Sequence, residues 1–297
     1  MATRTGNLDP SATPALAAGY EQQLNDDPRW ALSEGSRHFE EKSAVFDALH
    51  KIAGRLDELH IPYAIIGGMA LFMHGFRRFT DDVDVLVRKS DLKLVHEKLS
   101  GLGYLPPHRH SKHLRDVGNG VRIEFLTSGD YPGDGLEKPV AFPDPGTVAI
   151  ESGSIKYINL EKLIELKLAS GMTGAGRLRD LADVSELIRL LDLPAGFADR
   201  LDPYVRPAYD GLWRQSRQRF VMRLKKPDPA VPATIDDLSA MLPEQAESLK
   251  AMKRDGIAID ASRSGASHAY LVTTDPQVAR KYDMIEESEY WSDDSDT

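Results

Sequence analysis

Residues 65–87 read IIGGMALFMHGFRRFTDDVDVLV, an apolar run that breaks at Gly67-Gly68 and returns as valines alternating with Asp82 and Asp84. The glycine pair lies between a predicted strand and a predicted helix. Bare glycine N–H groups at the start of a helix allow an anion to approach the backbone closely. The segment therefore predicts a phosphate cradle followed by a pair of carboxylates.

The two aspartates lie in a predicted strand at 82–87, where alternate side chains share a face. Their Cα atoms are expected to lie roughly 6 to 7 Å apart. Glu124, in a second predicted strand at 120–126, alternates with apolar residues in the same way. Magnesium prefers hard oxygen ligands and leaves positions for substrate phosphates. Asp82, Asp84 and Glu124 thus predict a site for two Mg²⁺ ions, with Mn²⁺ as a substitute, or else the solvated face of two ordinary strands.

Charged and polar side chains flank this pattern. Arg78 and Thr80 directly precede the aspartates and are candidates either to bind phosphate or to fix the entry to the strand. Lys167 lies four residues after Leu163 and three after Ile164, inside the apolar stripe of a predicted helix. A buried ammonium group needs a carboxylate or phosphate partner, whereas a lysine at the edge of the stripe would extend to solvent.

The Gly-Gly pattern, the Asp-x-Asp pair and the later single carboxylate resemble the polymerase-β-type nucleotidyltransferase superfamily. The strings GGMALFMHGFRRFTDDVDVLV, RIEFLT and LIELKLASGMTGAGRLRDLADVSELI are most similar to AbiEii-like nucleotidyltransferase toxins and their uncharacterised bacterial relatives. The resemblance covers about residues 45–192, with Glu124 where Asp is common. It implies an α/β (α+β) nucleotidyltransferase fold, in which a small mixed sheet flanked by helices is followed by a helical region.

The resemblance also implies a reaction, the metal-dependent transfer of NMP from an NTP to an acceptor hydroxyl with release of pyrophosphate. A helical lysine and a downstream aspartate would complete the site; these are Lys167 and Asp180, with Asp183 less favoured. The candidate catalytic residues are therefore Asp82, Asp84, Glu124, Lys167 and Asp180. The candidate nucleotide-binding residues are Gly67, Gly68 and Lys167, together with Arg78 and Thr80 from their position before the aspartates. The acceptor would be an RNA 3′ end, a protein or a small molecule, and a toxin would have a cognate antitoxin protein as partner. The alternative is a non-catalytic nucleotide- or RNA-binding protein that retains the fold.

Composition limits the other possibilities. The chain has 297 residues, a net charge of −9 and no cysteine, which excludes disulfides, thiolate metal sites and cysteine nucleophiles. No apolar stretch approaches the roughly 20 residues that span a bilayer, so we predict a cytoplasmic protein without a membrane partner. We expect four parts: a partly disordered leader at 1–40, a catalytic domain at 41–158, a helical domain at 159–226, and a linker, small appendage and acidic tail at 227–297.

Two further segments carry weaker signals. The basic stretch at 213–226 falls in a predicted helix at 203–225 and is suited to an RNA backbone or to a solvated face. The stretch PPHRHSKHLR, with His108, His110 and His113, is suited to a metal or to anions.

The other predicted elements are helices at 43–59, 69–75, 91–101, 160–171, 177–192, 235–253 and 275–282, and strands at 62–66, 147–151, 155–158, 256–260 and 268–273.

Overall fold

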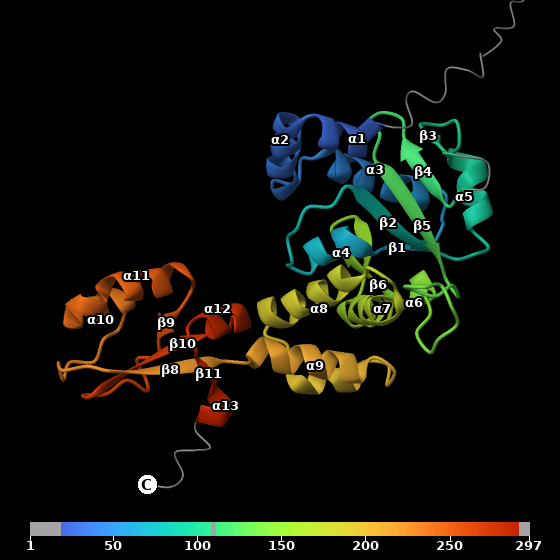
Figure 1. Ribbon diagram of the computed structural model, residues 1–297. Helices are drawn as coiled ribbons and strands as arrows, with labels where there is room; N and C mark the ends of the chain where they lie inside the picture. Colours follow the sequence, from blue (N-terminus) through green and yellow to red (C-terminus); the bar gives the residue numbers. More distant parts are fainter. Residues whose placement is uncertain (1–18, 108–110, 291–297) are drawn as a thin grey trace, which may run out of the picture. The chain divides into compact units, whose positions relative to one another are not determined.

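The computed structural model describes residues 19–107 and 111–290 (Figure 1). The chain divides into two compact units, Met1–Leu212 (unit 1) and Trp213–Thr297 (unit 2). Within the described ranges, no helix combines the length and the apolar character needed to cross a bilayer. His108 and His110 lie outside the described residues. The predicted division into four parts stays a prediction.

Unit 1 is built on a seven-stranded mixed sheet with the strand order β3-β4-β5-β2-β1-β7-β6. The pairs β2–β5 and β1–β7 are parallel, and the other neighbours are antiparallel. The predicted mixed α/β class is confirmed. The strands are β1 Tyr63–Ile65, β2 Asp82–Val87, β3 Tyr104–Leu105, β4 His113–Asp116, β5 Arg122–Thr127, β6 Ala149–Ser152 and β7 Ile155–Ile158.

Helices cover this sheet, and their apolar stripes supply much of the core. In α3, the residues Val45, Leu49, Ile52 and Leu56 recur at helical spacing and are all buried. Helices α7 and α8 pack against each other (Figure 1). The helices are α1 Gly19–Asp26, α2 Pro28–Phe39, α3 Ala44–Glu58, α4 Gly67–Met73, α5 Leu92–Leu99, α6 Pro145–Val148, α7 Leu160–Thr173, α8 Leu178–Leu190, the 3-10 helix Ala195–Arg200 and α9 Arg206–Arg217, which runs into unit 2.

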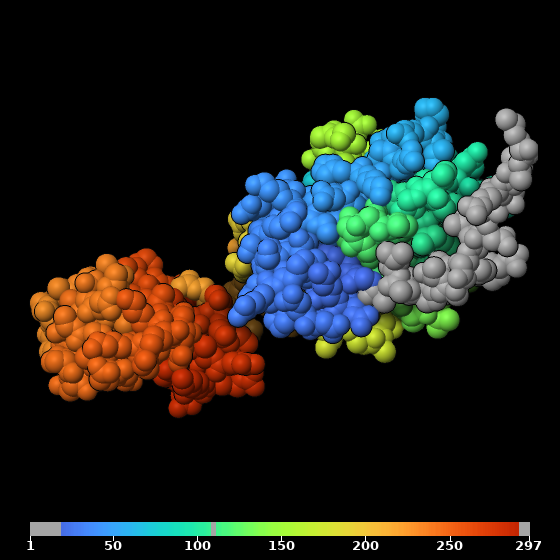
Figure 2. Space-filling view, turned by 90° about the horizontal axis from the view of Figure 1, so that it is seen from above, coloured from blue at the N-terminus to red at the C-terminus, as the bar shows by residue number. Residues whose placement is uncertain are grey.

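The first two helices are fixed to unit 1 by specific contacts. Tyr20 of α1 is 1% exposed and its hydroxyl donates a hydrogen bond to the buried Glu34 of α2. The Asp27 side chain caps the N-terminus of α2. Figure 2 shows these helices, in blue, beside a green part of unit 1. A Cβ added at Gly120 would lie 3.1 Å from the backbone nitrogen of Tyr20, so α1 packs closely against that glycine. Part of the predicted leader is therefore a folded component of unit 1.

Unit 2 is a four-stranded antiparallel sheet with the order β11-β8-β10-β9. Helices α10, α11 and α12 lie on one side of it and share its apolar core, in which Leu238, Leu249 and Leu271 are fully buried (Figure 1). The strands are β8 Phe220–Lys225, β9 Ala258–Ile259, β10 His268–Thr273 and β11 Ile285–Glu286, and the helices are α10 Ile235–Met241, α11 Ala246–Arg254, α12 Pro276–Lys281 and α13 Glu287–Tyr290.

Two predicted helices are wrong in part. The helix predicted at 203–225 ends at Arg217, and β8 follows because Phe220, Met222 and Leu224 alternate and pack against the core of unit 2. The helix predicted at 235–253 breaks near Pro243, which has no N–H to donate. The short strands β3 and β4 were not predicted. The remaining predicted elements are present, and most of their ends are shifted by one or two residues.

Candidate functional site

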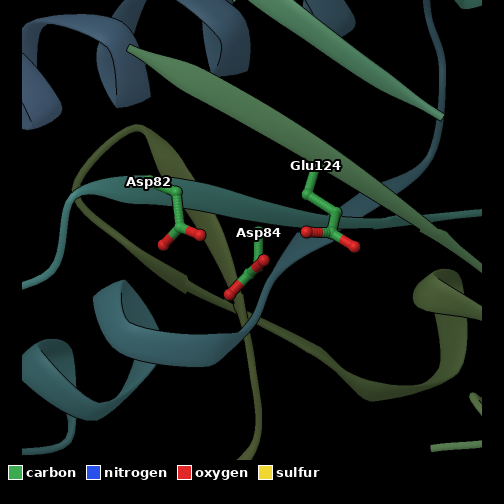
Figure 3. Close-up of side chains that lie close together, drawn as sticks. All are labelled: Asp82, Asp84 and Glu124. Atoms are coloured by element: carbon green, nitrogen blue, oxygen red, sulfur yellow. The ribbon is translucent and has the colours of Figure 1, made fainter. Parts of the chain in front are cut away.

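Three carboxylates meet on neighbouring parallel strands. In the register of β2 and β5, Asp84 is paired with Glu124 and Asp82 with Arg122. Asp82, Asp84 and Glu124 each offer a carboxylate oxygen, and these oxygens all lie within 4.8 Å of one another. Figure 3 shows the three side chains converging from the two strands. The structure thus brings together the carboxylates that the alternation in the sequence predicts.

The electrostatics of this cluster favour a cation. Burial, together with repulsion from Asp82 and Glu124, raises the pKa of Asp84 from 3.8 to about 8. An all-oxygen set of closely spaced carboxylates is the donor set that Mg²⁺ and Mn²⁺ prefer. A divalent ion would relieve the repulsion that otherwise holds a proton on Asp84. The donor chemistry of the cluster therefore fits a divalent metal.

The glycine pair comes directly against these carboxylates. Gly67 has a φ of 60°, and a Cβ at that position would lie 1.9 Å from Oδ2 of Asp84. A Cβ on Gly68 would lie 2.6 Å from Oγ1 of Thr80. Thr80 in turn donates a 3.0 Å hydrogen bond to Asp82. Both glycines are needed for the backbone to approach the cluster, and Thr80 fixes the carboxylate at the start of β2.

Lys167 of α7 points into the interior, as the stripe pattern predicts. It is 7% exposed, and its Nζ lies 2.8 Å from Oδ1 of Asp180 and 2.7 Å from Oδ2 of Asp183. Ser170 donates to the other oxygen of Asp180 at 2.7 Å. Burial raises the pKa of Asp180, but Lys167 and Ser170 outweigh it and hold that pKa below its usual range. The buried ammonium group has carboxylate partners from α8.

Asp183, which sequence reasoning placed second to Asp180, has the larger share of these bonds. Arg78 donates from Nε and Nη2 to its two oxygens, at 2.9 and 3.0 Å, in a two-pronged ion pair. Asp183 is 2% exposed and joins Arg78 to Lys167. Its position three residues after Asp180, on the buried side of α8, is the signal that could have identified it.

Two charged residues at this site were not predicted. Arg122 precedes Glu124 by two residues in RIEFLT and so shares its face, and its Nη2 lies 2.6 Å from Oδ2 of Asp82. Glu21 of α1 lies 3.9 Å from the Nε of Arg122. The alternation in β5 could have revealed Arg122. No local pattern marks Glu21, because it reaches the site through the docking of α1.

Most of these groups line one cavity of unit 1 with a volume of about 410 Å³, whereas Glu21 and Asp183 lie outside its lining. Such a volume is in the range of small-molecule sites. His113 lies outside its lining, with Nδ1 3.6 Å from Oε2 of Glu124, and no metal-binding group among the described residues includes a histidine. The lining includes Gly67, Gly68, Arg78, Thr80, Asp82, Asp84, Arg122, Glu124, Lys167, Arg177, Arg179 and Asp180.

Comparison with known proteins gives matches only among solved structures. No family model and no curated protein matches the sequence. The crystal structure of ANT(2″)-Ia in complex with adenylyl-2″-tobramycin is similar to 58% of this chain over 95% of its own, with 12% identity and a TM-score of 0.32. An antigenic nucleotidyltransferase-like protein from Paracoccidioides brasiliensis is similar to 69% of this chain over 91% of its own, with 15% identity and a TM-score of 0.33. Similarity at this level does not identify the reaction of this chain.

Proposed function

We propose that this chain is a metal-dependent nucleotidyltransferase that moves NMP from an NTP to an acceptor hydroxyl and releases pyrophosphate. The observation that carries the proposal is the cluster of three carboxylate oxygens within 4.8 Å of one another, beside a glycine pair and inside a cavity. Phosphoryl transfer depends mainly on positioning and on stabilising negative charge. A metal held by the carboxylate cluster would stabilise that charge, and the close approach of the backbone at the glycine pair would help to position the phosphates.

Asp82, Asp84 and Glu124 would hold the metal, with two Mg²⁺ ions as the proposed complement and Mn²⁺ as a substitute. When bound, the ions would neutralise charge on the triphosphate and on the attacking and leaving oxygens. Thr80 keeps Asp82 in place through its hydrogen bond. Glu124, at the edge of the trio on β5, is the residue we assign to the activation of the acceptor hydroxyl.

Nucleotide binding is assigned to the remaining side of the cavity. The backbone at Gly67 and Gly68 approaches the carboxylates closely because neither residue has a Cβ. Arg177 and Arg179 line the cavity and supply further positive charge toward phosphates. Lys167 and Arg78 both form ion pairs with Asp183. We therefore propose that they stabilise this side of the cavity and contribute positive electrostatic potential to it.

We propose that the acceptor is an RNA 3′ end, a protein hydroxyl or a small molecule. An RNA acceptor, and a role as a toxin with a protein antitoxin, agree with the sequence resemblance. The basic stretch at 213–226, which contains β8, supplies the positive charge that an RNA backbone would require.

The test is to incubate the full chain and Mg²⁺ with each α-labelled NTP, together with total cell RNA, total protein or candidate small molecules. We expect label in one acceptor fraction, and loss of transfer in Asp82→Asn and Asp84→Asn. Asp236→Asn, which alters an exposed aspartate of unit 2 paired with Lys253, is the control and should keep activity. Retained transfer in both active-site variants would contradict the assigned site. A failure to bind metal and any NTP by calorimetry would contradict the proposal and favour a non-catalytic binding protein.

A further inference from the structure

Arg122 lies next to the three carboxylates on the same face of the sheet. Asp82 is paired with Arg122 and Asp84 with Glu124 in the parallel register of β2 and β5. The Nη2 atom of Arg122 lies 2.6 Å from Oδ2 of Asp82 and 4.0 Å from Oε2 of Glu124. The guanidinium group therefore already neutralises an oxygen of the proposed metal-binding set.

This arrangement leaves Arg122 with an incomplete set of hydrogen bonds. Its Nε is buried and has no hydrogen-bond partner. A buried donor without a hydrogen-bond partner costs free energy, and this cost favours another position of the Arg122 side chain. Oε1 of Glu21 lies 3.9 Å from that Nε, beyond a hydrogen bond but within ion-pair range.

Glu21 is held in place as a second acceptor at the edge of the site. Its Oε2 accepts a 2.6 Å hydrogen bond from Nη1 of Arg115, and its Oε1 accepts one of 3.3 Å from Nη2. Arg115 also donates to the carbonyl of Gly120 at 2.9 Å, and the neighbouring Tyr20 is buried. A short rotation of Arg122 would thus bring its guanidinium group from one fixed carboxylate to another.

A divalent ion on Asp82, Asp84 and Glu124 would draw on the carboxylate of Asp82, of which Oδ1 accepts from Thr80 and Oδ2 contacts Arg122, and it would repel the guanidinium group. We propose that Arg122 is a positioning residue that exchanges Asp82 for Glu21 when the metal binds. The inference rests on the metal site of the proposed function. Its consequence is that α1, through Glu21, sets the affinity of a metal site formed by β2 and β5.

The test is calorimetric titration of the full chain with Mn²⁺ at a fixed pH. Arg122→Gln should bind Mn²⁺ more tightly, because the competitor for Asp82 is gone, and Glu21→Gln should bind it more weakly. Each change should be roughly 3- to 100-fold, the range of couplings between charged residues in contact. In the double variant the effect of Glu21→Gln should disappear, since Glu21 acts through Arg122. Arg88→Gln removes a cation of unit 1 that is paired with Asp144, outside the cavity, and should leave affinity unchanged.

The outcomes separate this inference from the proposed function. A wild-type chain that binds no Mn²⁺ would overturn both. If the wild type binds Mn²⁺ and Arg122→Gln binds it equally or more weakly, the exchange alone is overturned. The exchange is also overturned if Glu21→Gln changes the Mn²⁺ affinity by the same factor in the double variant as in the wild type. Mn²⁺ should also raise the melting temperature of Arg122→Gln more than that of the wild type. Arg122→Met, which keeps the packing of the side-chain stem, replaces Arg122→Gln if that variant does not fold.

Discussion

Replacing Gly67 with alanine should damage the carboxylate cluster as well as the backbone. An alanine at a φ of 60° costs about 1–2 kcal/mol in the left-handed region. The new Cβ would also lie 1.9 Å from Oδ2 of Asp84, so the carboxylate must leave its position. Displacing a side chain from its preferred rotamer adds roughly 0.5–1.5 kcal/mol. We expect Gly67→Ala to lower both the free energy of unfolding and the affinity for metal.

Gly153 provides a matched control for this substitution. Its φ is 63°, and a Cβ there would meet no atom within 4 Å. Gly153→Ala should therefore show the backbone cost of about 1–2 kcal/mol alone, with metal affinity unchanged. For Gly67→Ala we expect Mn²⁺ affinity to fall roughly 10- to 100-fold, the usual effect of disturbing the support of a metal ligand.

The two variants would be compared by urea unfolding and by calorimetric titration with Mn²⁺. The free energy of unfolding measured without metal reports the strain that each alanine introduces. The Mn²⁺ affinity from the titration reports whether the Asp84 carboxylate has been displaced. Equal losses of stability in Gly67→Ala and Gly153→Ala, together with wild-type metal affinity in both, would refute the argument that the Cβ position of Gly67 is occupied by the Asp84 carboxylate.

Two further predictions concern buried charge. Lys167→Met should lower the free energy of unfolding by about 3–5 kcal/mol, because Asp180 and Asp183 lose a buried partner. Lys93→Met, at an ion pair with Glu97 in which both side chains are exposed, should cost less than about 1 kcal/mol, and equal losses in urea unfolding would contradict this. Because the pKa of Asp84 is raised to about 8, its proton competes with the metal below that pH. Mn²⁺ affinity should then fall roughly tenfold per pH unit as pH is lowered from 8 to 6, whereas a flat affinity across that range would show that Asp84 is already ionised.

The sequence was sufficient for the carboxylate cluster because the relevant geometry is local. Alternation along a strand places Asp82 and Asp84 on one face whatever the rest of the fold does. Adding Glu124 to the cluster required one further assumption, that its strand lies next to β2. The observed register of β2 and β5 agrees with that assumption. The glycine pair was also readable, since only a residue without a Cβ allows the approach to Asp84.

The parts that could not be predicted depend on tertiary packing. The ion pair of Asp183 with Arg78 could not be predicted, because the two residues are 105 apart in sequence. Glu21 reaches the site only because α1 docks on unit 1. The end of the helix predicted at 203–225 was missed because a basic stretch fits a helix as well as a strand, and only the core of unit 2 selects the strand.

The shared carboxylate of Asp183 restricts how this protein can change over evolutionary time. It accepts hydrogen bonds from both Arg78 and Lys167, and all three groups are largely withdrawn from water. Losing one member leaves a charge in the interior without its partner, whereas losing matched charges together can be nearly neutral. Related chains should therefore keep the trio whole or replace it in concert, and a lineage that has lost Asp183 alone should carry a compensating loss of positive charge at position 78 or 167.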